Sequence, residues 1–175
     1  SVYRKPKTAS PVTVVNPVES DEFDSTTLGL QWQWHANYQQ KFGMPTSNGF
    51  FRMYTHKLSP DFKSLWEAPN LLLQKTPADT FTATSKLTFA AKKEGQYGGI
   101  IMMGRDYSAL VVRRVGNEFQ LQQLTCYGAD HGKTEIVKTL ATFQPSAADK
   151  IDYDPAIYRT IYLRLKVSEG AKMTF

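Results

Sequence analysis

The sequence has few of the features that span a membrane or reveal a compartment. Its 175 residues include one cysteine, Cys126, which cannot form a disulfide within the chain and so gives no information about redox compartment. The longest apolar run, residues 100–103, is far shorter than the roughly 20 residues of a membrane-spanning helix. We therefore expect no membrane-spanning segment and no membrane partner.

Motifs for several common activities are also missing. No Gly-x-Gly-x-x-Gly, P-loop or Gly-x-Ser-x-Gly pattern occurs, so neither nucleotide binding nor a serine hydrolase elbow is predicted. His35, His56 and His131 do not have the spacing of a zinc site. The net charge of +5 would suit acidic partners such as nucleic acid or glucuronate-decorated polysaccharide. Because the basic residues are scattered along the chain, we expect a solvated surface and no nucleic-acid partner.

The chain does contain many short segments with the pattern of strands. We predict strands at 28–36, 50–55, 70–75, 80–91, 97–104, 107–115, 118–126, 133–143 and 158–168. Gly116-Asn117 predicts a tight hairpin, because glycine allows the positive φ angle that such turns require. No long helical periodicity and no repeat of 20 to 50 residues is present. The pattern predicts an all-β protein built as a two-sheet antiparallel β-sandwich.

The first residues differ in composition from the rest. Residues 1–19 contain Pro6, Pro11 and Pro17 and are predicted to be a linker or N-terminal extension. An edge strand at 12–15 is the alternative. Residues 20–175 are predicted to form the one folded domain.

The segment 28–37 alternates apolar and polar residues. As a strand it would place Leu28, Leu30, Trp32 and Trp34 on one face, and Gly29, Gln31, Gln33 and His35 on the other. We predict that Trp32 and Trp34 are buried. The candidate carbohydrate or interdomain contact residues are Gln31, Gln33, His35, Asn37 and Trp66, the last of which lies in an irregular segment.

Two clusters of carboxylates are the only candidates for acid chemistry, and glycoside hydrolysis needs a pair of carboxyl groups. They are Asp21, Glu22 and Asp24, and Asp149, Asp152 and Asp154. Both lie in segments typical of exposed turns, so no catalytic residue is predicted. No cofactor or metal ligand is assigned, although hard oxygen ligands in the first cluster would suit a structural Ca²⁺.

Five segments in order resemble a known family. They are Asp21 to Asn37, Gly49 to Tyr54, Asn70 to Lys75, Phe81 to Phe89 and Tyr97 to Tyr107. Their order and spacing resemble the C-terminal β-sandwich domain of glycoside hydrolase family 43, the β-xylosidases and α-L-arabinofuranosidases. The resemblance covers residues 20–175 and implies a concanavalin A-like jelly roll.

The resemblance also implies where the chemistry lies. In this family the catalytic acids belong to a separate N-terminal five-bladed propeller, which this chain does not contain. Residues 161–167 are predicted to be a strand, 168–171 a turn and 172–175 the start of a return strand. The family continues beyond that point, so the chain lacks the family's last strands.

The function implied is that of a non-catalytic accessory domain. It would pack against the catalytic propeller of a glycosidase acting on xylan or arabinan side chains or oligosaccharides, and help to shape its sugar site. The alternative is a stand-alone, lectin-like carbohydrate-binding module that contacts hemicellulose oligosaccharides. The family implies a secreted or periplasmic protein, with a cytoplasmic one left open. Sugar specificity and oligomeric state are not predicted.

Overall fold

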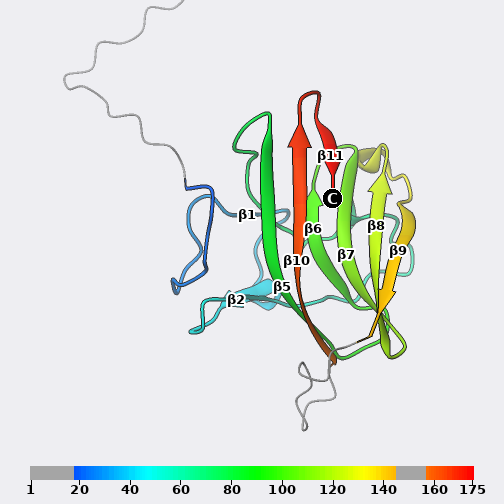
Figure 1. Cartoon of the computed structure of the whole chain (residues 1–175), viewed down its shortest axis with the longest axis horizontal. Coiled ribbons are helices and arrows are strands. Elements are labelled where there is room, and N and C mark those ends of the chain that lie inside the picture. The colour runs from blue at the N-terminus through cyan, green and yellow to red at the C-terminus, as the bar shows by residue number, and fades with distance from the viewer. Residues whose placement is uncertain (1–17, 145–156) are drawn as a thin grey trace, which may run out of the picture.

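The computed structural model describes residues 18–144 and 157–175 (Figure 1). The secondary structure of these residues consists of β-strands and short 3₁₀ helices. The strands are β1 (Gln33–Trp34), β2 (Gly43–Pro45), β3 (Phe51–Met53), β4 (Leu72–Leu73), β5 (Phe81–Ala91), β6 (Tyr97–Met102), β7 (Tyr107–Val115), β8 (Glu118–Cys126), β9 (Ile136–Phe143), β10 (Ile157–Ser168) and β11 (Lys172–Thr174). Three short 3₁₀ helices, η1 (Gln40–Phe42), η2 (Leu65–Glu67) and η3 (Ala129–His131), connect them. In the described part of the chain no helix has the length and apolar character needed to cross a membrane.

Two antiparallel sheets make up the body of the domain. The four-stranded sheet has the order β6-β7-β8-β9, and the three-stranded sheet has the order β11-β10-β5. Two small sheets, β1-β4 and β2-β3, come from the segment that precedes β5. Neighbours in the four-stranded sheet are consecutive in sequence: short turns join β6 to β7 and β7 to β8, and residues 127–135, which include η3, join β8 to β9. At the β7–β8 turn, Gly116 has a φ of +59°, which an L side chain rarely adopts.

One core lies between the two large sheets. Phe89 and Ala91 of β5 meet Val112 and Phe119 of the four-stranded sheet, and all four are buried. The rings of Phe89 and Phe119 pack edge to face with their centroids 5.8 Å apart. Because strand side chains alternate sides, this packing leaves the other face of the three-stranded sheet to solvent.

A second core covers the opposite face of the four-stranded sheet. There Tyr107, Ala109 and Val111 of β7 pack against Leu65 and Ala68, which lie in and directly after η2. β7 is therefore buried on both faces over its first six residues. We use the term covering segment for residues 62–71, which include η2. Its contacts hold the N-terminal third of the domain against the sheet.

Most of the predicted strands are confirmed. β7 and β8 have the predicted bounds, and the two-residue turn at Gly116-Asn117 joins them in the predicted register. β5, β6, β9 and β10 agree within a few residues, and β11 forms the predicted return strand, paired antiparallel with β10. The all-β sandwich is likewise confirmed.

The predicted long strand at 28–36 is wrong. Only Gln33 and Trp34 form a strand, and the Trp32 amide donates to the Gly29 carbonyl at 3.1 Å in a turn. Leu30 is therefore fully exposed, and Trp32 and Trp34 are half-buried instead of lining one apolar face. Apolar and polar residues do alternate in this segment, but the chain forms a turn at Gly29 in place of an extended strand.

Two further differences concern the same region and the ends of the chain. β2 was not predicted, and the predicted strands at 50–55 and 70–75 shorten to β3 and β4. The alternative edge strand at 12–15 and the acidic residues Asp149, Asp152 and Asp154 lie outside the described residues.

Candidate functional site

The candidate site is built on the segment 18–75, which Asp21 organises. One oxygen of the Asp21 carboxylate accepts the backbone amide of Phe23 at 2.8 Å. The other accepts the side-chain amide of Gln31 at 3.2 Å and the indole N–H of Trp32 at 2.7 Å. Phe23 has a φ of +54°, a costly conformation for a bulky residue, and its ring stacks on Trp32 with centroids 5.5 Å apart. The conformation of this loop is therefore fixed by hydrogen bonds to the Asp21 carboxylate.

The aromatic cluster continues from this loop into the β2–β3 hairpin. The ring of Phe51, on β3, lies 5.8 Å from Phe23 and 6.0 Å from Trp34. Trp34 also contacts Phe42, which is fully buried, at 5.5 Å. The hairpin is thus attached to the domain by the face that carries Phe51 and, at its base, by Phe42.

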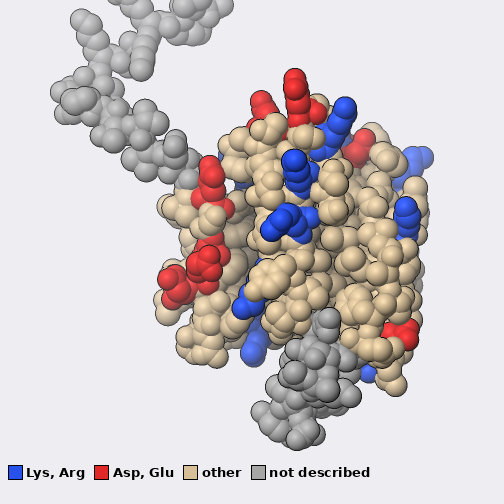
Figure 2. Space-filling model, viewed as in Figure 1, with Lys and Arg blue, Asp and Glu red and all other residues tan. Residues whose placement is uncertain are grey.

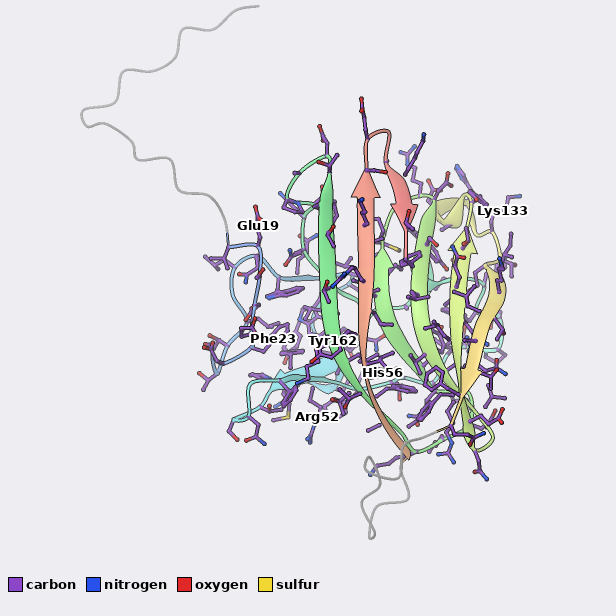
Figure 3. All side chains as sticks on the ribbon, in the orientation of Figure 1. Glu19, Phe23, Arg52, His56, Lys133 and Tyr162 are labelled. Atoms are coloured by element: carbon purple, nitrogen blue, oxygen red, sulfur yellow. The ribbon has the colours of Figure 1, made fainter. Side chains whose placement is uncertain are left out.

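The other face of the hairpin is exposed. We use the term hairpin face for Met44, Phe50, Arg52 and Tyr54, which share one side because Met44 pairs with Arg52 and the ladder continues through the pairs Thr46–Phe50 and Phe42–Tyr54. Met44, Phe50 and Tyr54 are 50%, 45% and 40% exposed. The Tyr54 hydroxyl donates to the Met44 sulfur at 3.4 Å, so these two side chains are in contact, and Phe50 lies on the same side of the hairpin. Arg52 is labelled in the lower part of Figure 3.

A hollow of about 250 Å³ lies beside the hairpin. Phe42, His56, Phe62 and Pro69 line it together with Gln39 and Asn70. A His56 ring nitrogen, Nε2, lies 2.9 Å from the Lys41 carbonyl oxygen, and the ring packs edge-on against Phe42 at 5.5 Å. The hollow is lined by both apolar and polar groups, but its only carboxylate is that of Glu67. It does not hold the pair of carboxyl groups that glycoside hydrolysis requires.

The predicted site residues separate into two groups. His35 and Trp66 come together: His35 Nε2 lies 2.9 Å from the Trp66 carbonyl oxygen, and the two rings are edge to face at 5.6 Å. Gln31 turns toward Asp21, while Gln33 and Asn37 are exposed. The structure therefore places them in one segment without assembling a single pocket from them. Their role in sugar or interdomain contact stays a prediction.

The acidic residues of the same loop bear on the predicted Ca²⁺. Both Asp21 oxygens already accept N–H donors, so hydrogen bonds within the protein use three of the roughly four acceptor sites of this carboxylate. Within residues 18–144 and 157–175, no three His, Cys, Asp or Glu side chains are grouped so as to hold a metal ion. A Ca²⁺ at this loop remains a sequence-based expectation.

A partly buried hydrogen bond joins Tyr107 to Glu135. The Tyr107 hydroxyl donates to a Glu135 oxygen at 2.6 Å and accepts the Leu65 amide at 2.8 Å. Burial and the hydrogen bond to Glu135 raise the pKa of Tyr107 well above its usual range. Burial likewise raises the pKa of the Cys126 thiol. The hydrogen bonds of Tyr107 hold the covering segment against the sheet. Glu135 is the one carboxylate in this group, so no carboxylate pair is formed here.

Two surfaces were missed by the sequence analysis. One is the hairpin face, for which Phe50-Phe51 was the available signal, because adjacent large residues in a strand must point to opposite sides. The other is the outward face of β10, where Tyr162, Arg164 and Lys166 alternate with the buried Leu163 and Leu165. That alternation was readable in the sequence, but the predicted strand was not divided into its two faces.

The fold and these surfaces define a concanavalin A-like β-sandwich domain with an exposed apolar hairpin. The family described as the β-xylosidase C-terminal concanavalin A-like domain matches residues 20–175. The chain therefore belongs to this family of glycoside hydrolase family 43 C-terminal domains.

Curated relatives have names that agree with this family. The chain is 29% identical to a β-xylosidase of Formosa agariphila over 129 residues, which cover 63% of this chain and 22% of that protein. It is 26% identical to the non-reducing end α-L-arabinofuranosidase BoGH43B of Bacteroides ovatus over 153 residues, which cover 85% of this chain and 27% of that protein. The chain thus spans about a quarter of the length of these relatives. No solved structure matches the chain.

Proposed function

We propose that this chain is the non-catalytic accessory domain of a family 43 glycosidase that acts on xylan or arabinan side chains or oligosaccharides. It packs against the catalytic propeller of the same enzyme through the hairpin face and helps to shape the sugar site there. Family membership, the names of the two relatives and the fraction of their length that the chain matches all support this role.

The observation that carries the proposal is the hairpin face. Contiguous apolar side chains left exposed on a soluble domain mark an interaction site. Here Met44, Phe50 and Tyr54 stand together, with Arg52 among them, and aromatic residues, Met and Arg are the residue types enriched at protein interfaces. The same hairpin contacts Phe23, close to the first described residues, through Phe51. The hairpin therefore lies near the point at which the described part of the chain begins.

The lectin-like alternative has less support at this surface. A sugar-binding sheet typically presents a row of solvent-facing aromatic rings. On the outward face of the three-stranded sheet, Tyr162 is the one aromatic ring among residues 82–90 and 160–174. The apolar hairpin instead favours contact with another folded domain.

Hydrogen exchange tests the proposal directly. Amide exchange is compared between the isolated 175-residue chain and the enzyme in which this chain follows its catalytic domain. We expect slower exchange in the enzyme across residues 43–54, because a packed domain excludes water from the hairpin. Slowing confined to another surface, or no slowing at all, would overturn the assignment.

A matched pair of variants gives a second measurement. Tyr54→Ser removes a ring from the hairpin face, whereas Tyr127→Ser removes an exposed ring that lies directly after β8. In the enzyme, Tyr54→Ser should lower Tm by about 2–4 °C more than Tyr127→Ser does, as expected for losing about 1 kcal/mol in a large protein. In the isolated chain the two variants should have similar Tm values. Equal effects in the enzyme would contradict a seam at the hairpin.

A further inference from the structure

The outward face of the three-stranded sheet has basic residues and no acidic ones. We use the term basic sheet face for Lys86 of β5, Arg164 and Lys166 of β10 and Lys172 of β11, together with Tyr162. All five side chains are exposed, and Tyr162 is 68% exposed. Figure 2 shows Lys and Arg over the middle of this face, with Asp and Glu toward its margins.

The register places these residues close together. Lys86 lies directly opposite Tyr162, and Arg164 lies opposite Thr84, whose hydroxyl accepts the Arg164 Nε–H at 3.2 Å. Lys166 and Lys172 follow along β10 and its return strand. From Tyr162 to Ser168 the face extends about 20 Å, at the usual rise per strand residue. Tyr162 is labelled on β10 in Figure 3, at the lower part of this strip.

Within residues 82–90, 160–168 and 172–174, the remaining outward side chains of the sheet are small and mostly carry hydroxyl groups. They are Thr82, Thr84, Thr88 and Ala90 of β5, Thr160 and Ser168 of β10, and Thr174 of β11. None is Asp or Glu, and no ion pair among the described residues involves any of the four cations. The nearest carboxylate in sequence is Glu169, in the turn beyond the strand.

This segregation is more than a solvated sheet face requires. A sheet that only meets water gains from mixed signs, because like charges on neighbouring strands repel one another. Here Glu19, Asp21, Glu22 and Asp24 gather in the entry loop instead, which leaves a single-sign field over β5, β10 and β11. A field of one sign attracts a ligand of the opposite sign.

We propose that the basic sheet face binds uronate-bearing hemicellulose, a polysaccharide whose side groups carry carboxylates. The cations pair with the carboxylates, the Tyr162 ring stacks on a sugar face, and the threonine hydroxyls bond to sugar hydroxyls. The choice of ligand class rests on the proposed function. The site lies on a different face from the apolar part of the hairpin and adjoins it where Lys86 Nζ sits 5.8 Å from the Phe50 ring.

The residue types argue against two other anionic partners. Lysine is depleted in protein–protein interfaces, and this face has three lysines and, besides Tyr162, only Ala90 as an apolar side chain. Single-stranded nucleic acid is held by successive aromatic platforms, whereas Tyr162 is the one ring on this face among residues 82–90, 160–168 and 172–174. A polysaccharide with widely spaced carboxylates is matched by a surface that combines cations, hydroxyl groups and an aromatic ring, as this face does.

The test measures binding of the 175-residue chain to glucuronoxylan and to the same polymer after reduction of its carboxyl groups. Affinity electrophoresis and calorimetry should show tighter binding to the acidic polymer, weakened when NaCl rises from 50 to 500 mM. The double variant Arg164→Gln/Lys166→Gln should weaken that binding about tenfold, the size expected for losing two exposed ion pairs. Tyr162→Ala should weaken binding to both polymers.

Controls make the outcome decisive. Lys138→Gln removes an exposed cation from β9, on the other sheet, and should leave binding unchanged. Equal binding to the two polymers, equal losses from Lys138→Gln and the double variant, or binding to a single-stranded DNA as tight as to glucuronoxylan would each overturn the proposal. If the double variant instead releases hydrogen-exchange protection in the enzyme, the face is a domain seam. Tyr54→Ser should not alter polysaccharide binding, so this proposal and the proposed function can fail separately.

Discussion

At the scale of single residues, Tyr107 has an influence that its place in the sequence did not indicate. Its ring is buried in the core beneath η2, and its hydroxyl joins β7 to both the Leu65 amide and the Glu135 carboxylate. Three segments far apart in sequence are thereby held at one oxygen atom. The sequence showed only an aromatic residue at the start of a strand.

Replacing that hydroxyl should be costly. Tyr107→Phe leaves the Glu135 carboxylate and the Leu65 amide without their partner, and a group so abandoned typically costs about 1–3 kcal/mol. We expect the free energy of unfolding to fall by roughly that amount in urea denaturation. Tyr162→Phe, which removes a hydroxyl from an exposed ring, is the matched control and should change stability by less than about 0.5 kcal/mol. A similar loss in both variants would show that the buried hydrogen bonds do not stabilise the fold.

At the scale of elements, the sequence predicted the long strands, because their positions are set by the pattern of apolar and polar residues. β5, β8 and β10 are long and alternate over most of their length, whereas β7 has a continuous apolar run at its centre. All four end at glycine or polar turns, so their existence followed from the residues. The segment 28–36 alternated as well, yet it has only two strand residues, because Asp21 binds Gln31 and Trp32 from a distant position. Tertiary contacts of that kind are not visible in local periodicity. The hairpin face was missed for another reason: β2 is three residues long, which is too short to show a periodic pattern.

Two adjacent glycines in β6 offer a test at this scale. A Cβ added at Gly99 would lie 2.0 Å from the Leu110 carbonyl oxygen and 2.7 Å from the Val111 Cα, both backbone atoms of β7. A Cβ at Gly98 would lie 4.0 Å from the Phe89 ring, which is ordinary contact. Gly99→Ala should therefore force β6 away from β7 and destabilise the protein by about 2–3 kcal/mol, as overpacking does.

The neighbouring substitution supplies the control. Gly98→Ala should be neutral or slightly stabilising, because alanine restricts the unfolded chain more than glycine does. Thermal unfolding of the two variants, followed by circular dichroism, measures the difference. If both tolerate alanine equally, the close approach of β6 to β7 is not a constraint on this sheet.

At the scale of the whole molecule, β7 of the four-stranded sheet is buried on both faces over its first six residues, and the two layers that cover it come from different parts of the chain. The three-stranded sheet covers one face with Phe89 and Ala91, and the segment around η2 covers the other with Leu65 and Ala68. The first layer followed from the sequence, because a sandwich requires it. The second did not, since residues 56–69 are largely irregular and gave no strand or helix pattern. The surfaces left free, the hairpin face and the basic sheet face, are the outer sides of the segments that complete this arrangement.

The layer under η2 should make the molecule sensitive to alkali. Tyr97 of β6 packs against that core, and burial, followed by the charge of Glu135, raises its pKa to about 12, although Arg113 stacked 4.3 Å from its ring centre opposes the shift. In the unfolded chain a tyrosine titrates near 10, so above pH 10 the unfolded state loses its proton first. The folded state then holds more protons, and stability falls as pH rises. The contribution of Tyr97 is fully present below pH 10 and is lost progressively between pH 10 and about 12.

Urea unfolding at intervals from pH 8 to pH 11.5 measures this loss. Tyr97→Phe cannot ionise, so its stability should fall less steeply with pH above 10 than that of the unmodified chain. Tyr127→Phe, which alters an exposed tyrosine, should keep the steeper slope. Tyr107 has a raised pKa for related reasons and remains in both variants, so Tyr97→Phe should reduce the slope without abolishing it. Identical slopes for the two variants would mean that the layer beneath η2 stays solvated enough for Tyr97 to titrate as it does in the unfolded chain, which its burial in this fold argues against.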